Sequence, residues 1–411
     1  MTQQEAIEVM LSGKNVFLTG EPGAGKTYTL NEFIRRAQAL DKRIAITAST
    51  GIAASHLGGT TIHSWSGLGI ADAIHDADLD RMSYKPQIRE RYNRCDILII
   101  DEVSMLHGSR LDMVDRACRW IRHNEKPFGG LQVILVGDMF QLPPVTRGSD
   151  ETDYAHLSNA WRVAELTPCY LTEQHRQGAD DKLLSILRDM RSGELSDTAK
   201  AMLQERVNES PDDSITKLYT HNVDVDTLNN NKLAELEGTQ RSWTMTGKGK
   251  DWEIDKLKKN LLCPEKLYLK VGAEVMFVAN DFEAGFVNGT RGRVIAFDMG
   301  DPVVETTDGQ RIHVEEHTWR QFNETGEYVR AEVSQIPLRL AWAVTIHKSQ
   351  GMSLDAAEID LSKAFVPGMG YVALSRVRSL DGLYLVGLGP QALQMDPDIY
   401  KFDKALKQGR S

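Results

Sequence analysis

The amino-acid sequence predicts an α/β protein with two cores built on parallel sheets and a small antiparallel β barrel inserted into the second core. Short, continuous apolar runs alternate with helix-like segments in both halves, which is typical of buried parallel strands covered by helices on both faces. A stretch of short β runs with turn signals interrupts the second half. With 411 residues, of which 41% are hydrophobic, the chain is long enough for more than one buried core.

The first predicted core covers residues 1–168. Its predicted buried strands are the apolar runs at residues 15–19, 43–47, 96–100 and 132–137. Residues from about 66 to 94 break this rhythm with scattered charges, a proline and no strong period, so we predict a small insertion there.

The second predicted core is divided between residues 169–240 and 337–411, and the inserted region covers residues 241–336. The predicted elements of this core include helices at 181–191 and 198–207 and strands at 217–220, 357–361 and 383–387. The inserted region carries the short β runs and an Asn288-Gly289 turn, and such a turn is typical of antiparallel hairpins.

The charge distribution argues against a uniformly basic surface for nucleic acid. The formal net charge is −10, so any such site must be local. Residues 248–270 hold seven lysines against four acidic residues, a pattern that suits either a phosphate track or a solvated helix face.

Neither the cysteines nor the apolar runs indicate a secreted or membrane protein. The cysteines Cys95, Cys118, Cys169 and Cys263 have no paired spacing, which predicts neither a zinc site nor a disulfide framework. No apolar run approaches the roughly 20 residues that span a bilayer, and the first residues lack the core of a signal peptide. We therefore expect a cytoplasmic protein with no membrane partner.

Residues 20–27 (GEPGAGKT) match the full spacing of a phosphate-binding loop, directly after a predicted strand and before a predicted helix. The residues expected to bring backbone N–H groups to the phosphates are Gly20, Gly23, Ala24 and Gly25. Lys26 supplies a cation, and Thr27 supplies a hydroxyl ligand for Mg²⁺. The sequence therefore predicts a site for a nucleoside triphosphate.

Two further strands end in side chains that suit hydrolysis at this site. Asp101 and Glu102 follow an apolar run, at the edge of the sheet where ligands bind in open α/β folds. We expect Asp101 to hold Mg²⁺, directly or through water, and Glu102 to take a proton from the attacking water. Gln141 follows the next strand and is predicted to sense the γ-phosphate; by itself it fits a surface loop equally well.

With these motifs in place, the chain resembles the helicases of superfamily one, and within them the Pif family (petite integration frequency), across nearly its whole length. The matching stretches are TGEPGAGKT and residues 47–65, 99–106, 126–145, 171–177, 343–355 and 370–385. The spacer that ends in KPFGG (residues 126–130) separates this family from the related RecD and Dda helicases.

The resemblance implies further nucleotide contacts. Gln4 looks like the glutamine that binds the adenine edge, with Gln3 as a near alternative. Arg176 and Arg376 look like the two arginines that the second core contributes to the γ-phosphate, and Gly351 falls in a motif that contacts the nucleotide. A guanidinium stabilises charge on the transferring phosphoryl group, and without the family match each arginine would fit a surface salt bridge better.

The resemblance also implies two DNA-contacting motifs. The residues assigned to them are Thr50, Gly51, Thr61 and His63 in the first core and Thr345, His347 and Lys348 in the second. Small hydroxyl residues and glycines suit contacts with phosphates. The alternative for the two histidines is a polar residue at a helix end. Trp65, Phe140 and Trp342 suit either base stacking or the core, and we favour the core.

Taken as a member of this family, the chain has two RecA-like cores and an SH3-like barrel in the second, and it uses ATP and Mg²⁺ to move 5′-to-3′ along single-stranded DNA. The direction comes from the resemblance alone. The implied partners are single-stranded, forked or structured DNA, including G-quadruplexes in repair or recombination. We expect a monomer with the extent of a bare motor core.

Two other functions remain open at this point. One is a P-loop ATPase that binds nucleic acid as a switch or remodeller without unwinding it; such a protein would lack the paired arginines and the second sheet. The other is a RecD-like helicase subunit of a nuclease complex, against which the KPFGG spacer argues.

Overall fold

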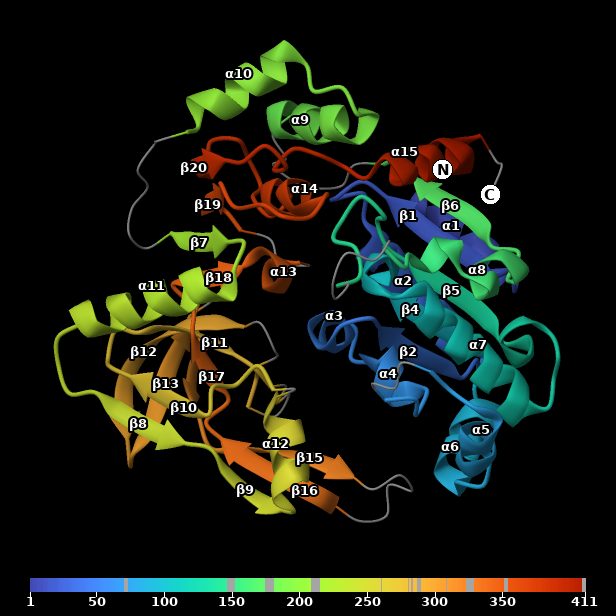
Figure 1. Cartoon of the computed structure of the whole chain (residues 1–411), viewed down its shortest axis with the longest axis horizontal. Helices are drawn as coiled ribbons and strands as arrows, with labels where there is room; N and C mark the ends of the chain where they lie inside the picture. The colour runs from blue at the N-terminus through green and yellow to red at the C-terminus, as the bar shows by residue number, and fades with distance from the viewer. Residues whose placement is uncertain are drawn as a thin grey trace. The chain divides into compact units, whose positions relative to one another are not determined.

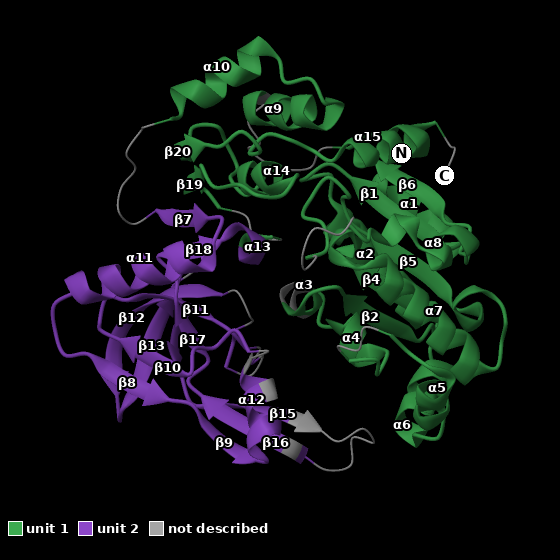
Figure 2. Cartoon of the chain, in the orientation of Figure 1, with its two compact units in different colours: residues 1–211, 349–411 green, residues 212–348 purple. Residues whose placement is uncertain are grey.

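The computed structural model describes residues 1–69, 73–145, 152–173, 181–207, 215–259, 261–279, 281, 284–286, 290–307, 309–322, 329–350 and 354–408. The chain forms two compact units, which Figure 2 colours separately. Unit 1 contains residues 1–211 and 349–411, and unit 2 contains residues 212–348. Residues 169–211, which we predicted for the second core, thus belong to unit 1, and the division into two cores stays a prediction.

Unit 1 is built around a six-stranded sheet in the order β3-β2-β4-β5-β1-β6, and its strand pairings are parallel (Figure 1). The strands are β1 Val16–Gly20, β2 Ile44–Ala48, β3 Thr60–Thr61, β4 Ile97–Asp101, β5 Gln132–Val136 and β6 Thr167–Leu171. The four apolar runs of the first half are therefore strands, and the predicted parallel α/β core is confirmed.

Successive side chains along a strand point to opposite faces of the sheet, so apolar strands have two faces to bury. Helices cover both faces of this sheet. The helices are α1 Gln3–Leu11, α2 Lys26–Ala39, α7 Gly108–Arg122 and α8 Asn159–Val163. Val16 and Leu18 of β1 pack in one apolar cluster with α1 and α2. Phe17, between them, faces the other side, where its ring centroid lies 4.8 Å from that of Trp161 in α8.

The predicted insertion at residues 66–94 contains two short helices, α5 Asp76–Ser83 and α6 Pro86–Asn93. Tyr92 of α6 is fully buried, and its hydroxyl donates to the Ser66 carbonyl over 2.8 Å. Its ring lies 4.8 Å from that of Trp65, measured between centroids. One anchored aromatic side chain thus fastens this helical pair to the core.

The rest of unit 1 consists of short helices and a pair of parallel strands. Its other elements are α3 Gly51–His56, α4 Ile62–Trp65, α9 Asp181–Ser192, α10 Asp197–Glu205, β19 Ala357–Leu361, α14 Met369–Leu374, β20 Leu383–Leu388 and α15 Pro397–Lys407, with 3₁₀ turns at Val103–Met105, Pro127–Gly130 and Ala155–Leu157. Strands β19 and β20 pair in parallel. Of the helices in the described part of the chain, none has the length and apolarity to cross a membrane.

Unit 2 combines a small parallel pair with antiparallel sheets. The parallel pair is β7 Thr216–Tyr219 with β18 Ala343–Thr345, beside α11 Asn222–Glu235. The other elements are β8 Arg241–Thr244, β9 Thr246–Gly249, α12 Asp251–Lys259, β10 Lys266–Leu269, β11 Glu274–Phe277, β12 Arg291–Asp298, β13 Asp301–Thr306, β14 Arg311–His313, β15 His317–Phe322, β16 Val329–Gln335 and β17 Leu338–Leu340. Helix α13, Ile346–Ser349, follows β18.

The antiparallel strands form a five-stranded sheet, β14-β13-β12-β11-β17, a three-stranded sheet, β15-β16-β9, and the pair β10-β8. Val275, Phe277, Val294 and Val304 alternate inward in the five-stranded sheet and share one buried cluster. The predicted antiparallel character of this region is therefore confirmed, whereas its SH3-like form stays a prediction. The predicted Asn288-Gly289 turn lies outside the described residues.

Candidate nucleotide site and nucleic-acid contacts

The phosphate-binding loop connects the end of β1 at Gly20 with the start of α2 at Lys26. Gly23 and Gly25 have φ angles of +84° and +81°, in the left-handed region that favours glycine. A Cβ atom on Gly25 would also collide with the side-chain amide of Gln3. The loop therefore needs glycine for its turn and for the close approach of α1.

Lys26 folds back over this loop and faces the carboxylates of the neighbouring strands. Its Nζ atom donates to the carbonyls of Gly20 (2.8 Å) and Glu21 (3.1 Å). Burial lowers the pKa of the Lys26 ammonium, and the negative charges of Asp138 and Glu102 oppose this shift. Lys26, Asp101 and Glu102 are thus brought together, as the sequence predicted.

Asp101 ends β4, and Glu102 begins a sharp turn after it. Glu102 has a φ angle of +51°, an uncommon conformation for a residue with a side chain. The turn is held by Ser49, whose N–H donates to the Asp101 carbonyl (3.0 Å) and whose hydroxyl donates to the Glu102 carbonyl (2.7 Å). Burial and the neighbouring Glu102 raise the pKa of the Asp101 carboxyl.

The oxygen donors at this edge fit Mg²⁺. Thr27, in the first turn of α2, and Asp101, at the end of β4, supply a hydroxyl and a carboxylate, and Mg²⁺ prefers such hard oxygen ligands together with phosphate oxygens. The Lys26 ammonium opposes the rise in the pKa of Asp101. No group of three or more His, Cys, Asp or Glu side chains that could hold a metal ion occurs among the described residues, and phosphate and water oxygens would complete the coordination of Mg²⁺.

Gln350 is a site residue that the sequence did not single out. Its side-chain N–H donates to Glu102 Oε2 over 3.0 Å, and only 7% of the residue is exposed. Its own side-chain oxygen is buried and has no hydrogen-bond partner among the described residues. Gln350 lies two residues after the predicted DNA-contacting residues 345–348, so its position near that motif was the one available signal.

Gln141 lies on the loop that follows β5, and this loop is buried. Gln141 is 7% exposed, and its backbone N–H donates to the Asp138 carbonyl over 2.9 Å. Asp138 is fully buried, and although burial raises its pKa, Arg191 and Lys26 hold that pKa below its usual value. The loop is thus tied to an ionised carboxylate beside Lys26.

The two glutamines at the start of the chain lie in different surroundings, and Gln4, our first choice for the adenine contact, is not the one near the nucleotide site. Gln3 reaches the phosphate-binding loop, where its side-chain N–H donates to the Ala24 carbonyl over 3.3 Å. Gln4 points away and bonds Glu8 (2.9 Å) and Arg36 (3.2 Å) at the surface. Because α1 turns by about 100° per residue, adjacent glutamines face different directions. The structure therefore favours Gln3 over Gln4 at the nucleotide.

Arg376 is buried behind the site, with 5% of the residue exposed. Its guanidinium donates to the Val372 carbonyl (2.9 Å), the Ser375 hydroxyl (2.7 Å) and the Ser349 carbonyl (3.4 Å). It therefore contacts the residue next to Gln350, and its predicted role at the γ-phosphate stays a prediction. Arg176 and Gly351 lie outside the described residues.

The three threonines predicted to contact DNA each begin a short helix. The Thr50 hydroxyl accepts from Ala53 N–H (3.2 Å), that of Thr61 from Ser64 N–H (3.3 Å) and that of Thr345 from Lys348 N–H (3.4 Å). This is the ordinary N-cap interaction, so all three side chains have a local structural role. Among the described residues, no atom lies within 4 Å of where a Cβ atom on Gly51 would stand.

The basic residues predicted to contact DNA are partly desolvated. Burial, with Arg110 and His107, lowers the pKa of His63 to about 4, and burial with His221 lowers that of His347. Both histidines are therefore neutral at pH 7 and offer hydrogen bonds instead of a charge. Burial and Arg339 lower the pKa of Lys348 to about 8, and its ammonium lies 3.4 Å from Asn222 Oδ1.

The aromatic residues considered for base stacking belong to apolar cores. Trp65 and Phe140 are 8% and 3% exposed, and Trp342 packs against the buried cluster of unit 2. The core interpretation that we favoured is therefore confirmed for Trp65 and Phe140, whereas Trp342 is only partly buried and its assignment stays a prediction.

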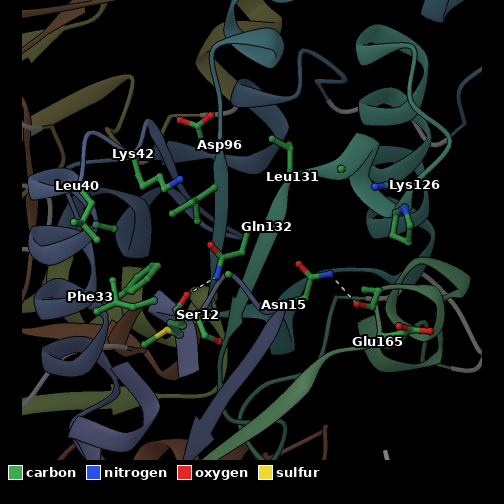
Figure 3. Close-up of a pocket in the computed structure, with 18 of the residues that line it drawn as sticks. Ser12, Asn15, Phe33, Leu40, Lys42, Asp96, Lys126, Leu131, Gln132 and Glu165 are labelled. Carbon is green, nitrogen blue, oxygen red and sulfur yellow. Dashed lines mark hydrogen bonds between the residues drawn. The ribbon is translucent and has the colours of Figure 1, made fainter. Parts of the chain in front are cut away.

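A cavity of about 680 Å³ lies at the opposite end of the same strands (Figure 3). Asn15, Ile97 and Gln132, which line it, stand at the amino ends of β1, β4 and β5. The amides of Gln132 and Asn15 are satisfied by backbone carbonyls, for example those of Met10 (2.7 Å) and Ala164 (2.8 Å). The charged residues that line this cavity, Lys42, Asp96, Lys126 and Glu165, are exposed or half-buried, unlike those at the carboxyl edge.

Two protein-family models and several known proteins match this chain. Residues 3–201 match the family model described as PIF1-like helicase, and residues 254–297 match the one described as the 2B domain of DNA helicase Pif1. The chain is 42% identical over 457 residues to the ATP-dependent DNA helicase Pif1 of Psychrobacter sp. strain PRwf-1, covering 97% of this chain and 69% of that protein.

Two solved structures have the same fold. The crystal structure of Pif1 helicase from Candida albicans superposes with a TM-score of 0.90 at 32% identity and covers 98% of both chains. The Bacteroides Pif1 helicase in complex with ADP-AlF3 and single-stranded DNA superposes with a TM-score of 0.79 at 32% identity, covering 99% of this chain and 96% of that one. The phosphate-binding loop, the paired carboxylates and these likenesses together show that the chain belongs to the PIF1-like helicase family.

Proposed function

We propose that this chain uses ATP hydrolysis at the carboxyl edge of the six-stranded sheet to move 5′-to-3′ along single-stranded DNA and unwind duplexes. As a member of its family, it is an ATP-dependent DNA helicase. The observation that carries the mechanism is the meeting of Lys26 with Asp101 and Glu102 at the end of parallel strands.

Each side chain at this edge has a role that follows from its position. Lys26 and the backbone N–H groups of the loop bind the β- and γ-phosphates. Glu102 accepts the proton of the attacking water, and Gln141 orients that water or the γ-phosphate. Gln3 contacts the adenine side of the nucleotide. Mg²⁺, held by Thr27 and Asp101, would neutralise charge on the phosphates.

The coupling to DNA rests on the predicted two-core arrangement. RecA-like cores would close on ATP, so that Arg176 and Arg376 stabilise the charge of the transferring phosphoryl group. Grip on the strand would then alternate between residues 50–63 and residues 345–348, with an SH3-like barrel within residues 241–336 covering the strand. We further propose that the protein acts in the cytoplasm as a monomer on single-stranded, forked or structured DNA.

The test compares the intact protein with Lys26→Ala. ATPase rate is measured with and without single-stranded DNA, and unwinding is measured on duplexes with a 5′ or a 3′ tail. We expect DNA to stimulate ATP hydrolysis, unwinding to require the 5′ tail, and both activities to disappear in the variant. ATP hydrolysis that ignores DNA, with no unwinding from either tail, would refute the proposal; unwinding from the 3′ tail would refute the direction.

A further inference from the structure

A buried charged cluster lies beside the nucleotide site, where its carboxylate faces Lys26 of the phosphate-binding loop. It consists of Arg191, Asp138 and Tyr371, which we call the Arg191 cluster. Arg191 Nη1 lies 2.7 Å from Asp138 Oδ1 and 2.8 Å from the Tyr371 hydroxyl, which in turn donates to Asp138 Oδ2 over 3.1 Å. The three side chains thus form a closed triangle of hydrogen bonds.

Burying the Arg191 cluster costs free energy. The side chain of Arg191 is 4% exposed, and that of Asp138 is fully buried. Removing two charges from water offsets much of their attraction, so an apolar replacement of similar volume is often equally stable. The guanidinium carbon also lies 4.3 Å from the centroid of the Phe140 ring, which adds a cation–π contact. A buried ion pair can instead hold the segments that it joins in a fixed geometry.

The cluster joins the segments that carry the groups proposed for the γ-phosphate. Asp138 fixes the loop of Gln141, because its carboxylate accepts from Phe140 N–H (3.2 Å) and its carbonyl accepts from Gln141 N–H (2.9 Å). Tyr371 lies in α14, five residues before Arg376. Helices α9 and α14 pack together in unit 1 (Figure 1).

Arg191 itself stands at the end of α9, a helix that also contacts the phosphate-binding loop. Arg188, one turn earlier, lies 3.2 Å from Glu21 of that loop. In the sequence, α9 begins five residues after Arg176. One guanidinium therefore links the helix that follows Arg176, the loop of Gln141 and the helix that precedes Arg376.

We propose that Arg191 is a positioning residue for ATP hydrolysis. Resting on the function proposed above, the inference is that Arg191 acts through Asp138 and Tyr371 to hold Gln141 and Arg376 in register with the γ-phosphate. Arg191 does not touch the nucleotide. Its loss therefore weakens binding of the transition state and leaves binding of the product ADP unchanged.

The chain offers a matched control for this inference. Arg191 Nη2 points away from the loop and donates to the Tyr170 hydroxyl over 2.8 Å. Tyr170 lies on β6, which carries none of the groups proposed for the γ-phosphate. Tyr371→Phe and Tyr170→Phe each delete one hydroxyl bonded to the same guanidinium, but only the first also removes a hydrogen bond to Asp138, whose direct bond to Arg191 remains.

The experiment uses the full chain and measures three quantities for each variant: the melting temperature, the affinity for ADP, and the affinity for ADP with aluminium fluoride, Mg²⁺ and single-stranded DNA. For Tyr371→Phe we expect ADP affinity to stay within about twofold, while affinity for the aluminium fluoride complex and kcat both fall about tenfold at unchanged KM. For Tyr170→Phe we expect a similar melting temperature and wild-type values of all these constants.

Arg191→Lys keeps the charge but cannot bond three oxygens in a fork, so its loss should exceed that of Tyr371→Phe. Equal behaviour of the two tyrosine variants, or equal losses of ADP and aluminium fluoride affinity, would overturn the role of Arg191. A wild-type protein that hydrolyses ATP without unwinding DNA would instead end the helicase proposal, and the ratio of the two affinities would still decide the role of Arg191.

Discussion

The two ends of the six-stranded sheet in unit 1 differ in where their charges lie. At the carboxyl edge, Asp138 and Arg191 are buried, and Lys26, which is half-buried, faces them. At the amino edge lies the cavity of about 680 Å³. Lys42 and Lys126 on its rim are exposed. The same strands therefore end at a site of desolvated charges on one side and at a cavity with solvated charges on the other.

This difference teaches that volume alone does not identify a site. Burying a charge costs free energy unless a partner offsets it, so a group of buried charges indicates a function that outweighs the cost. The rim charges of the amino-edge cavity keep their water, and its amides are satisfied internally. Chemistry belongs to the carboxyl edge, and the predictions below test that assignment.

The largest effect is expected at Glu102. Glu102→Gln keeps the shape of the side chain but removes the proton acceptor, so kcat for ATP hydrolysis should fall by about 10²- to 10⁴-fold. The variant should bind ADP as the wild type does, which titration with a fluorescent ADP analogue measures. A kcat within tenfold of the wild-type value would mean that another group takes the proton.

The second prediction concerns the pH dependence of DNA binding by Lys348. Lys26 faces carboxylates that favour its charged form, whereas Lys348 has a pKa of about 8. If Lys348 binds a DNA phosphate, binding raises its pKa, so affinity for single-stranded DNA is constant below pH 8 and falls up to about tenfold per pH unit above it. Lys348→Arg, which stays charged, should flatten this profile between pH 7 and 9. An unchanged profile would remove Lys348 from the DNA site.

The third prediction separates the adjacent glutamines of α1. Gln3→Ala should raise KM for ATP about fivefold, the effect of losing one or two hydrogen bonds to a ligand. Gln4→Ala should leave KM within about twofold, because Gln4 bonds surface side chains. Steady-state kinetics measure both, and the reverse order would restore Gln4 as the adenine contact.

The fourth prediction concerns the hydrogen bond from Gln350 to Glu102. This bond holds the carboxylate oxygen that must accept a proton. Gln350→Ala should therefore raise the ATPase rate without DNA about threefold and reduce the stimulation by DNA in proportion. A fall in the DNA-free rate would show that Gln350 supports Glu102 and does not restrain it.

The smallest effect is expected at the amino edge. Lys126→Ala removes a charge from the cavity rim, where water already solvates it, so kcat and KM should stay within about twofold and stability within about 0.5 kcal/mol. Calorimetry and ATPase assays on this variant complete the comparison. A loss of activity there would break the contrast between the two edges.

The sequence predicts four of the six strands of the sheet in unit 1, because β1, β2, β4 and β5 are continuous apolar runs. Strands β3 and β6, which are short or partly exposed, are not predicted. It does not predict β8 and β9, since their residues are largely exposed and carry no alternation. It also misses α5 and α6, each of which buries only two side chains. Short elements with so few buried residues have no detectable period.

The site shows the same limit. Lys26, Asp101 and Glu102 follow from motifs that combine adjacent residues with their place on a strand. Gln350 bonds a residue 248 positions away, and no local pattern reports such a contact. The choice between Gln3 and Gln4 depends on the rotational phase of a helix, which sequence spacing fixes only when the helix start is known.

The left-handed backbone of Glu102 sets stability and activity against each other. A side chain in this conformation costs roughly 1 to 2 kcal/mol, and asparagine tolerates it better than glutamate. Selection for heat resistance alone would therefore enrich substitutions at position 102 that relax the turn and abolish hydrolysis. Engineering a hardier form of this motor should hold that codon constant and seek its gains elsewhere.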